Sequence, residues 1–438
     1  MKRPWTNLPW LVPLNVFYGV MMLIGWPYYL FLLATRAKYR AHLLERWGLA
    51  PKFARGKKCL WVHAISVGEA EAARTFLPAL REAFPDAEVV FSTTTLTGRE
   101  RARKLFPDIP VFHFPLDLAL PVILALWRVR PTAVIQVESE WWPMFFWIAQ
   151  LFGIPVLCVN VRITEKAERG YSWVRRPMAA TFNAAVAIGV QAEVYAARLR
   201  RLGCHAGRIR VTGQMKHDVV TFLDSVPGAD AVAREVGLRP EEAVLVAAST
   251  APEETGTLLA AYRIARRTHG ELRLVIVPRR PESFDATAAA IREAGLPVVR
   301  RSRPGQVDGA AAAEPPVILG DTMGEMMKWY ALARIIFVGR SLVHLGGSNP
   351  MEPGALARPL LWGPEMFNFP VEGPALVEAG AARVVRDAAE MAAAVEELLT
   401  RPDLCRQMGE AARATIRGMQ GATARSIELV RQTLGAVL

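Results

Sequence analysis

The sequence predicts an α/β protein made of two doubly wound domains, each built on a parallel sheet. Short apolar runs alternate with segments of helical period along most of the 438 residues, which is the pattern of βαβ units. The alternation comes in two series separated by residues 219–240, where no comparable apolar run occurs. Several runs end in glycine-containing turns, and ligands of such sheets bind beyond the carboxyl ends of the strands.

The first element along the chain is an uncharged, apolar segment. Residues 4–35 carry no charged side chain and are long enough to span a bilayer, which needs about 20 apolar residues. Pro13, Gly25 and Pro27 would interrupt a straight helix, so a kinked span and a helix lying in the membrane interface both stay open. A cleaved signal peptide is a third interpretation, although its apolar region should be shorter and end in a small-residue cleavage site.

The next segment is strongly basic. Residues 36–58 contain eight Lys/Arg and one Glu, a large share of the formal net charge of +12. Because this segment directly follows the apolar one, anionic lipid headgroups are a better partner than nucleic acid, and the flank predicts a cytoplasmic location for the rest of the chain. Tyr39, Leu43 and Trp47 recur at helical spacing, as in an amphipathic helix on a membrane, although the same stripe could pack on the protein.

The predicted organisation is a membrane segment with a basic amphipathic helix at 1–48, a first domain at 49–218, a linker at 219–240 and a second domain with C-terminal helices at 241–438. The strands expected in the first domain lie near 60–65, 89–91, 111–114, 133–137, 156–159 and 186–188. Those expected in the second lie near 244–248, 272–277, 317–319, 335–338, 359–362 and 383–385. Residues 305–316 read as a surface loop, and the four scattered cysteines favour a reducing compartment.

Glu69 is the first candidate for chemistry. The run Ser66-Val-Gly-Glu69 follows the first strand and opens a helix. Ser-x-x-Glu is a capping box, in which the carboxylate satisfies a backbone N–H. A carboxylate at this end of a strand could also face the cleft and remove a proton from a hydroxyl group.

Two further motifs end strands of the first domain. Glu138 and Glu140 are spaced i, i+2 in extended chain, so they should face the same side, where they could do acid/base work, hold a lysine or cap the next helix. Lys216, in Gly213-Gln-Met-Lys-His-Asp218, could offset charge on a departing phosphate, although a lone lysine is more often simply solvated.

The second domain carries three candidate anion-binding turns at strand ends. Arg279 follows a strongly apolar strand, and a guanidinium there suits a phosphate or carboxylate. The runs 321–325 and 346–353 each join a strand to a helix start. Glu352 would lie on the first helical turn behind Pro350, where its carboxylate could accept hydrogen bonds from the two hydroxyls of a ribose.

Taken in this order, the motifs resemble those of the 3-deoxy-D-manno-octulosonic acid (Kdo) transferases, membrane-attached glycosyltransferases that move Kdo from CMP-Kdo to a lipid A precursor. The resemblance spans about residues 61–369. It implies the GT-B arrangement of two Rossmann-like domains facing a cleft, the first binding the acceptor and the second the CMP-sugar. It also implies Glu69 as general base, with Glu138 and Lys216 stabilising the transition state of an inverting single displacement. The donor-site residues that it implies are Pro278, Arg279, Met323, Gly324, Glu325, Asn349, Pro350, Met351 and Glu352.

The resemblance also implies the partners. These are CMP-Kdo, a lipid A precursor and an anionic membrane surface, with no nucleic acid, in a protein of the cell inner membrane whose catalytic part is cytoplasmic. No metal and no cofactor is expected, because the sequence contains neither His/Cys clusters at metal spacing nor an Asp-x-Asp motif.

The chain departs from the family pattern at three donor-site positions. Arg280 replaces a histidine, Arg340 a glycine and Ser348 a histidine. A related transferase with a different nucleotide-sugar donor therefore stays open. So does a nucleotide-sugar isomerase on the same scaffold, since fold alone does not fix the reaction.

Overall fold

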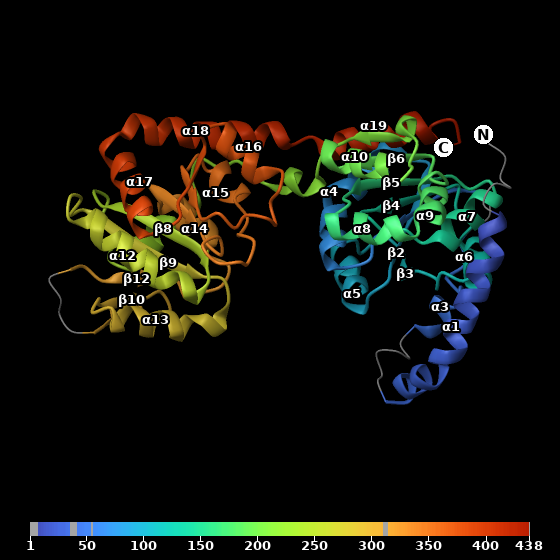
Figure 1. The fold of residues 1–438 in the computed structure, drawn as a ribbon, viewed down its shortest axis with the longest axis horizontal. Coiled ribbons are helices and arrows are strands. Elements are labelled where there is room, and N and C mark those ends of the chain that lie inside the picture. The colour runs from blue at the N-terminus through green and yellow to red at the C-terminus, as the bar shows by residue number, and fades with distance from the viewer. Residues whose placement is uncertain (1–7, 36–41, 54–55, 310–313, 438) are drawn as a thin grey trace. The chain divides into compact units, whose positions relative to one another are not determined.

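A computed structural model describes residues 8–35, 42–53, 56–309 and 314–437 of the chain. The chain forms two compact α/β units, which we call unit 1 (Met1–Val219 with Gln420–Leu438) and unit 2 (Val220–Met419). Each unit contains one sheet covered by helices, as Figure 1 shows. The prediction of two α/β units with parallel sheets is confirmed.

The sheet of unit 1 has seven strands in the order β3-β2-β1-β4-β5-β6-β7. All neighbouring strands pair in parallel, as expected for βαβ units. The sequence prediction omits the seventh strand, β7, which has the charged Arg210 at its centre and two of its three residues exposed. The strands are β1 (Lys58–His63), β2 (Ala87–Thr93), β3 (Val111–His113), β4 (Ala133–Val137), β5 (Val156–Val161), β6 (Ala187–Val190) and β7 (Ile209–Val211).

Helices cover both faces of this sheet. One apolar core joins a sheet face to α6, α7, α9 and α10, and the other joins the opposite face to α4, α5 and α19. The helices are α1 (Leu8–Thr35), α3 (Leu43–Arg46), α4 (Val67–Ala83), α5 (Leu96–Leu105), α6 (Ala119–Val129), α7 (Pro143–Leu151), α8 (Glu165–Trp173), α9 (Arg175–Phe182), α10 (Glu193–Arg201) and α19 (Ala422–Leu434), with 3₁₀ turns η2 (Ala206–Arg208) and η3 (Met215–Val219).

The sheet of unit 2 has eight strands in the order β11-β10-β12-β9-β8-β13-β14-β15. Pairing is parallel throughout except for the edge strand β11, which is antiparallel and lies in the predicted surface loop. The strands are β8 (Ala243–Thr250), β9 (Leu272–Pro278), β10 (Val298–Arg300), β11 (Val307–Asp308), β12 (Val317–Leu319), β13 (Ile335–Val338), β14 (Leu360–Trp362) and β15 (Ala382–Val384).

The helices of unit 2 also form two layers. α12, α13 and α17 pack on one face of the sheet, and α11, α14, α15 and α16 on the other, while α18 contributes to both cores. The elements are α11 (Ala229–Glu235), η4 (Pro252–Glu254), α12 (Thr255–Arg266), η5 (Pro281–Ser283), α13 (Phe284–Glu293), α14 (Met326–Leu332), α15 (Met351–Ala355), α16 (Glu372–Glu378), α17 (Ala388–Thr400) and α18 (Pro402–Met419).

Two predicted boundaries differ from the structure. The segment read as a linker is part of unit 2, since Val232, Val236 and Leu238 are buried in its core. The second domain, predicted to run to residue 438, ends at Met419, because α19 packs against α4 and the sheet of unit 1. The spacing of apolar residues in the sequence shows that a helix such as α19 is amphipathic. It does not show which of the two sheets that helix packs against.

The N-terminal segment folds as the long helix α1. Its first turns pack against unit 1 through Trp10, Leu11 and Leu14, and the exposed side chains farther along include Leu23 and Ile24. Over the part of the chain that the structure describes, we find no helix that combines the length and the hydropathy needed for a membrane crossing. Of the predicted amphipathic helix, residues 36–41 lie outside the described residues, and α3 accounts for only four of the remainder.

Candidate active site

Glu138 and Lys216 form an ion pair at the carboxyl edge of the unit 1 sheet. Glu138 follows β4, and its Oε1 accepts a hydrogen bond from Lys216 Nζ at 3.2 Å. Burial raises the pKa of Glu138, and the neighbouring ammonium group opposes that rise. Because the carboxylate is one-fifth exposed and the amine about half exposed, both groups remain open to a ligand.

Glu69 lies in the first turn of α4 and closes the capping box that its sequence predicts. Its Oε2 accepts a hydrogen bond from the backbone N–H of Ser66. The charge of Glu69 also raises the pKa values of Glu138 and Glu140, so the three carboxyl groups lie near one another. The two interpretations of Glu69 are therefore compatible, since a carboxylate has a second oxygen and further lone pairs.

Glu140 also lies in this cluster, and its sequence position left open whether it does acid/base work, holds a lysine or caps the next helix. Burial, together with the charges of Glu69 and Glu138, raises its pKa to about 7. Like charges held close together disfavour ionisation of each other. At neutral pH the cluster therefore holds one carboxyl group that is poised between its two protonation states.

The turn that carries Lys216 is fixed from two sides. Gly213 precedes it with φ +90°, and a Cβ atom there would approach the guanidinium of Arg425 at 2.7 Å. Asp218 accepts hydrogen bonds from the first backbone N–H groups around the start of α19, including Gly421 N at 2.7 Å. The aspartate of the Gly-x-x-Lys-x-Asp motif thus anchors the C-terminal helix to the turn.

In unit 2, Arg279 and Glu352 lie close together beyond β9. Pro278 is the buried last residue of that strand, and the exposed Arg279 follows it. Burial raises the pKa of Glu352, and the charge of Arg279 opposes that rise. Glu352 lies on the first turn of α15, as predicted, and the described residues supply no hydrogen-bond donor to its carboxylate. The group is thus available to a ligand.

The other donor-site residues are placed by different contacts. Met323 is 69% exposed, and Gly324 adopts φ +84°. Asn349 is exposed, with its Oδ1 accepting a hydrogen bond from Met351 N at 3.0 Å. Pro350, the N-cap of α15, is buried like Met351.

Glu325 is held by an internal ion-pair network. It accepts hydrogen bonds from Lys328 Nζ at 2.8 Å, Thr322 Oγ1 at 2.6 Å and Arg301 Nε at 3.0 Å. Burial opposes ionisation, but these hydrogen bonds outweigh it and lower the pKa of Glu325 to about 2. The carboxylate therefore stays charged and stiffens the turn before α14.

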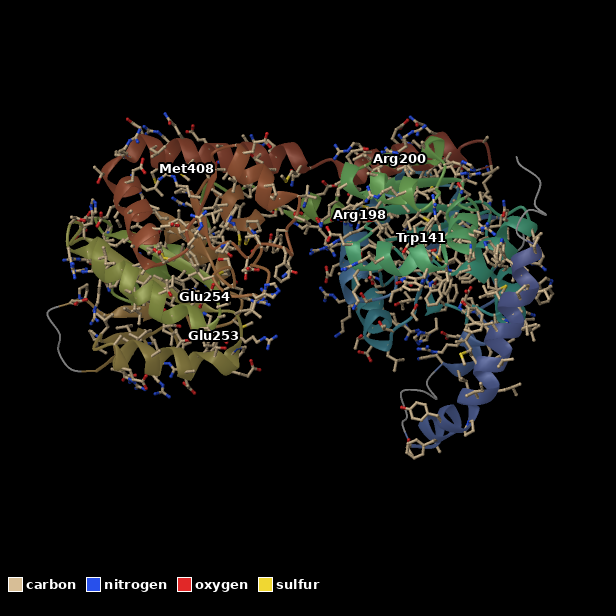
Figure 2. The ribbon with its side chains drawn as sticks, in the orientation of Figure 1. Trp141, Arg198, Arg200, Glu253, Glu254 and Met408 are labelled. Carbon is tan, nitrogen blue, oxygen red and sulfur yellow. The ribbon has the colours of Figure 1, made fainter. Side chains whose placement is uncertain are left out.

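A buried carboxylate, Glu254, joins two strand ends of unit 2 and explains one departure from the family pattern. It accepts hydrogen bonds from the backbone N–H groups of Arg340, Ser341 and Leu342, at 2.7 to 3.0 Å. Glu254 and Glu253 lie in the turn η4, directly before α12 (Figure 2). Arg340 adopts φ +62°, the left-handed conformation that a glycine adopts most easily. The loop thus keeps a conformation suited to glycine although arginine occupies the position.

The second departure, Ser348, also has a structural role. Its side chain is buried, and its hydroxyl donates a hydrogen bond to Ser249 O at 3.2 Å. Gly346, two residues earlier, is packed so closely that a Cβ atom would overlap the side chain of Asn368. Nothing in the structure assigns a partner to the third departure, the exposed Arg280.

Among the described residues, no group of three or more His, Cys, Asp or Glu side chains could hold a metal ion. The structure adds two residues to those predicted from the sequence: Asn160, which contacts Glu138, and Glu254, which binds the loop that starts at Arg340. Asn160 directly follows the apolar run at 156–159, so its place at a strand end was the available signal.

Comparison with known proteins identifies the family. Residues 41–219 match the family model described as 3-deoxy-D-manno-octulosonic-acid transferase. The chain is 31% identical to the 3-deoxy-D-manno-octulosonic acid transferase of Haemophilus influenzae, over 95% of this chain and 98% of that one. It is 32% identical to the Bordetella pertussis protein of the same name, over 86% and 87% of the two chains.

Solved structures show a similar fold at much lower identity. UDP-GlcNAc 2-epimerase from Neisseria meningitidis, 14% identical, has a TM-score of 0.59 over 86% of this chain and all of that chain. At that identity the similarity concerns the α/β architecture alone. The relatives of higher identity, over nearly their whole length, place the chain in the Kdo transferase family of glycosyltransferases.

Proposed function

We propose that this protein transfers Kdo from CMP-Kdo to a sugar hydroxyl of a lipid A precursor. The observation that carries the proposal is the meeting of Glu69, Glu138 and Lys216 at one sheet edge, from three distant parts of the chain. Family membership supports Kdo as the transferred sugar, and CMP-Kdo and the lipid A precursor are the donor and acceptor that the sequence resemblance implies. The exposed Arg279 supplies a cation for a phosphate. Glu352, to which the described residues donate no hydrogen bond, supplies an acceptor for ribose hydroxyls.

The proposed reaction is a single displacement. Glu69 removes the proton from the acceptor hydroxyl, and the oxygen attacks the anomeric carbon of Kdo. The bond from that carbon to the phosphate oxygen breaks, and CMP leaves. Lys216, held by Glu138, offsets the negative charge that grows on the departing phosphate, and the anomeric centre is inverted.

The protein is further proposed to bind the cytoplasmic face of the inner membrane. Support comes from α1, whose Val12 and Leu23 are 67% and 77% exposed, and from Trp127 on α6, which is 56% exposed. Beside Trp127 a cavity of about 170 Å³ is lined by Lys52, Arg128 and Arg130 with the two aromatic residues Phe53 and Trp127. Apolar side chains next to cations suit an anionic lipid surface.

The role of Glu69 is tested by Glu69→Gln. The amide retains an oxygen that accepts the Ser66 N–H bond, so the start of α4 should be unchanged while the base is lost. We expect the rate of Kdo transfer from CMP-Kdo to a lipid A precursor to fall about 100- to 10,000-fold. Glu71→Gln, two residues farther along α4, is the matched control and should transfer Kdo at the wild-type rate. Equal activity in both variants would reduce Glu69 to a helix cap.

A further inference from the structure

Asn160 occupies an unusual backbone position at the end of the strand that neighbours β4. It lies in β5, its side chain is completely buried, and its φ is +58°. Its hydrogen-bonded neighbour Glu138 also has positive φ, at +67°. Left-handed conformations in residues other than glycine are uncommon and cluster where surrounding contacts enforce them, although asparagine tolerates them better than most residues.

The Asn160 side chain uses both ends of its amide. Nδ2 donates to Glu138 Oε1 at 3.3 Å, and Oδ1 accepts from the backbone N–H of Met215 at 3.0 Å. Lys216 follows Met215 and contacts the same Glu138 oxygen at 3.2 Å. The amide orientation follows from the partners, because the reverse would place an oxygen against a carboxylate and an N–H against an N–H.

The backbone of Asn160 is also fixed. Its carbonyl oxygen accepts a hydrogen bond from Gln191 Nε2 at 2.9 Å, from the loop after β6. One side chain, held in place by its own backbone, therefore links a strand end to the turn that follows β7. Neither partner could shift relative to the other without breaking a buried hydrogen bond, which is costly.

We infer that Asn160 is a positioning residue that sets the Glu138 carboxylate against the turn carrying Lys216. The inference rests on the proposed roles of those two residues in transfer. Because Asn160 is completely buried, its effect passes through the ion pair. Its N–H donor favours the charged form of Glu138. Burial and the charge of Glu69 raise the pKa of that carboxyl group, and the charges of Lys216 and Arg162 lower it.

Two substitutions separate the two ends of the amide. Asn160→Asp keeps an oxygen for Met215 N–H but replaces the donor to Glu138 with another carboxyl group. We expect kcat to fall about 10- to 100-fold with KM for CMP-Kdo unchanged, and the acidic limb of the kcat profile to move to higher pH, because the pKa of Glu138 rises. Asn160→Gly tolerates the positive φ but loses both bonds.

Amide hydrogen exchange gives a readout that is independent of activity. In Asn160→Gly the N–H of Met215 should lose protection, whereas in Asn160→Asp it should keep it. Asn183→Asp is the matched control: this asparagine also uses both ends of its amide within unit 1, for Gly203 O and His205 N. Its substitution should leave the pH profile and the exchange of Met215 unchanged.

The outcomes separate the positioning role from the proposed function. An unshifted pH profile in Asn160→Asp, or full protection of Met215 in Asn160→Gly, would overturn the positioning role. A shift of equal size in Asn183→Asp would also overturn it, because a charge added elsewhere in unit 1 would then suffice. A wild-type protein that transfers no Kdo would refute the proposed function, while the exchange experiment would still decide whether Asn160 fixes the turn.

Discussion

Folding of unit 1 disfavours the ionised form of the Glu140 side chain. Its pKa of about 7 in the folded protein lies above the value of about 4.3 for an unperturbed glutamate. Between these values the unfolded chain releases its proton while the folded chain keeps it, so Glu140 makes the fold less stable as pH rises from about 4 to about 7.

Glu140→Gln removes this penalty. At about pH 8 the variant should unfold with a free energy on the order of 1 kcal/mol higher than wild type, a figure reduced because the group is partly exposed and screened. The gain should shrink as the pH falls through 7 and vanish near pH 4. Denaturant unfolding at several pH values measures it, with Glu71→Gln as control. A difference independent of pH would contradict the pKa assigned to Glu140.

Residues at strand ends could be predicted from the sequence, but their contacts could not. Glu138 and Lys216 follow apolar runs, and the carboxyl ends of parallel strands share one edge. That Asn160 links them depends on β5 lying beside β4 and on the path from β7 to η3. Sequence pattern gives neither of these. The ion pair between Glu325 and Arg301 could not be predicted either, because it also depends on which segments lie side by side in the fold.

At the scale of elements, close packing between α15 and α18 positions the donor-site helix. A Cβ atom on Gly409 of α18 would overlap the carbonyl oxygen of Ala357, which follows α15 and itself has φ +54°. Gly354, within α15, meets Ile416 of α18 in the same way. The start of α15 carries Glu352, so α18 supports the helix on which this carboxylate lies.

Gly409→Ala should therefore destabilise unit 2. We expect a loss of about 1–3 kcal/mol, because backbone must move to admit the methyl group. Gly418→Ala on the same helix is the control, since no atom lies within 4 Å of the added Cβ and alanine favours helix. Thermal unfolding of both variants measures the difference. Equal melting temperatures would show that the contact between α15 and α18 can relax freely.

The sequence predicted most strands of both sheets but misplaced the helices at the boundaries. Long apolar runs such as β9 stand out by composition. The strands absent from the prediction, β7, β10 and β11, are short and each includes a charged residue. The packing of α19 on unit 1 depends on tertiary contacts that the sequence pattern does not show. Asp218 accepts hydrogen bonds from N–H groups at the start of α19, and the apolar face of α19 lies in the core of unit 1.

At the scale of the whole molecule, the proposed membrane contact predicts a charge-dependent affinity for lipid. Lys52→Glu reverses a cation at the cavity beside Trp127. Binding of the full chain to vesicles containing anionic lipid should weaken about 30-fold, because Lys→Glu changes the charge by two units and each unit contributes roughly 1 kcal/mol. Lys104→Glu, on the exposed side of α5, makes the same change of charge and is the control. Equal weakening would mean that only net charge matters.

The central claim about the whole molecule is that CMP-Kdo is the sugar donor of the reaction. The most direct test incubates the wild-type full chain with CMP-Kdo and a lipid A precursor and follows both products by mass spectrometry. We expect lipid that has gained Kdo and an equal amount of released CMP. No Kdo on the lipid, with consumption of another nucleotide sugar or with conversion of a soluble nucleotide sugar when lipid is absent, would contradict the proposed donor and reaction.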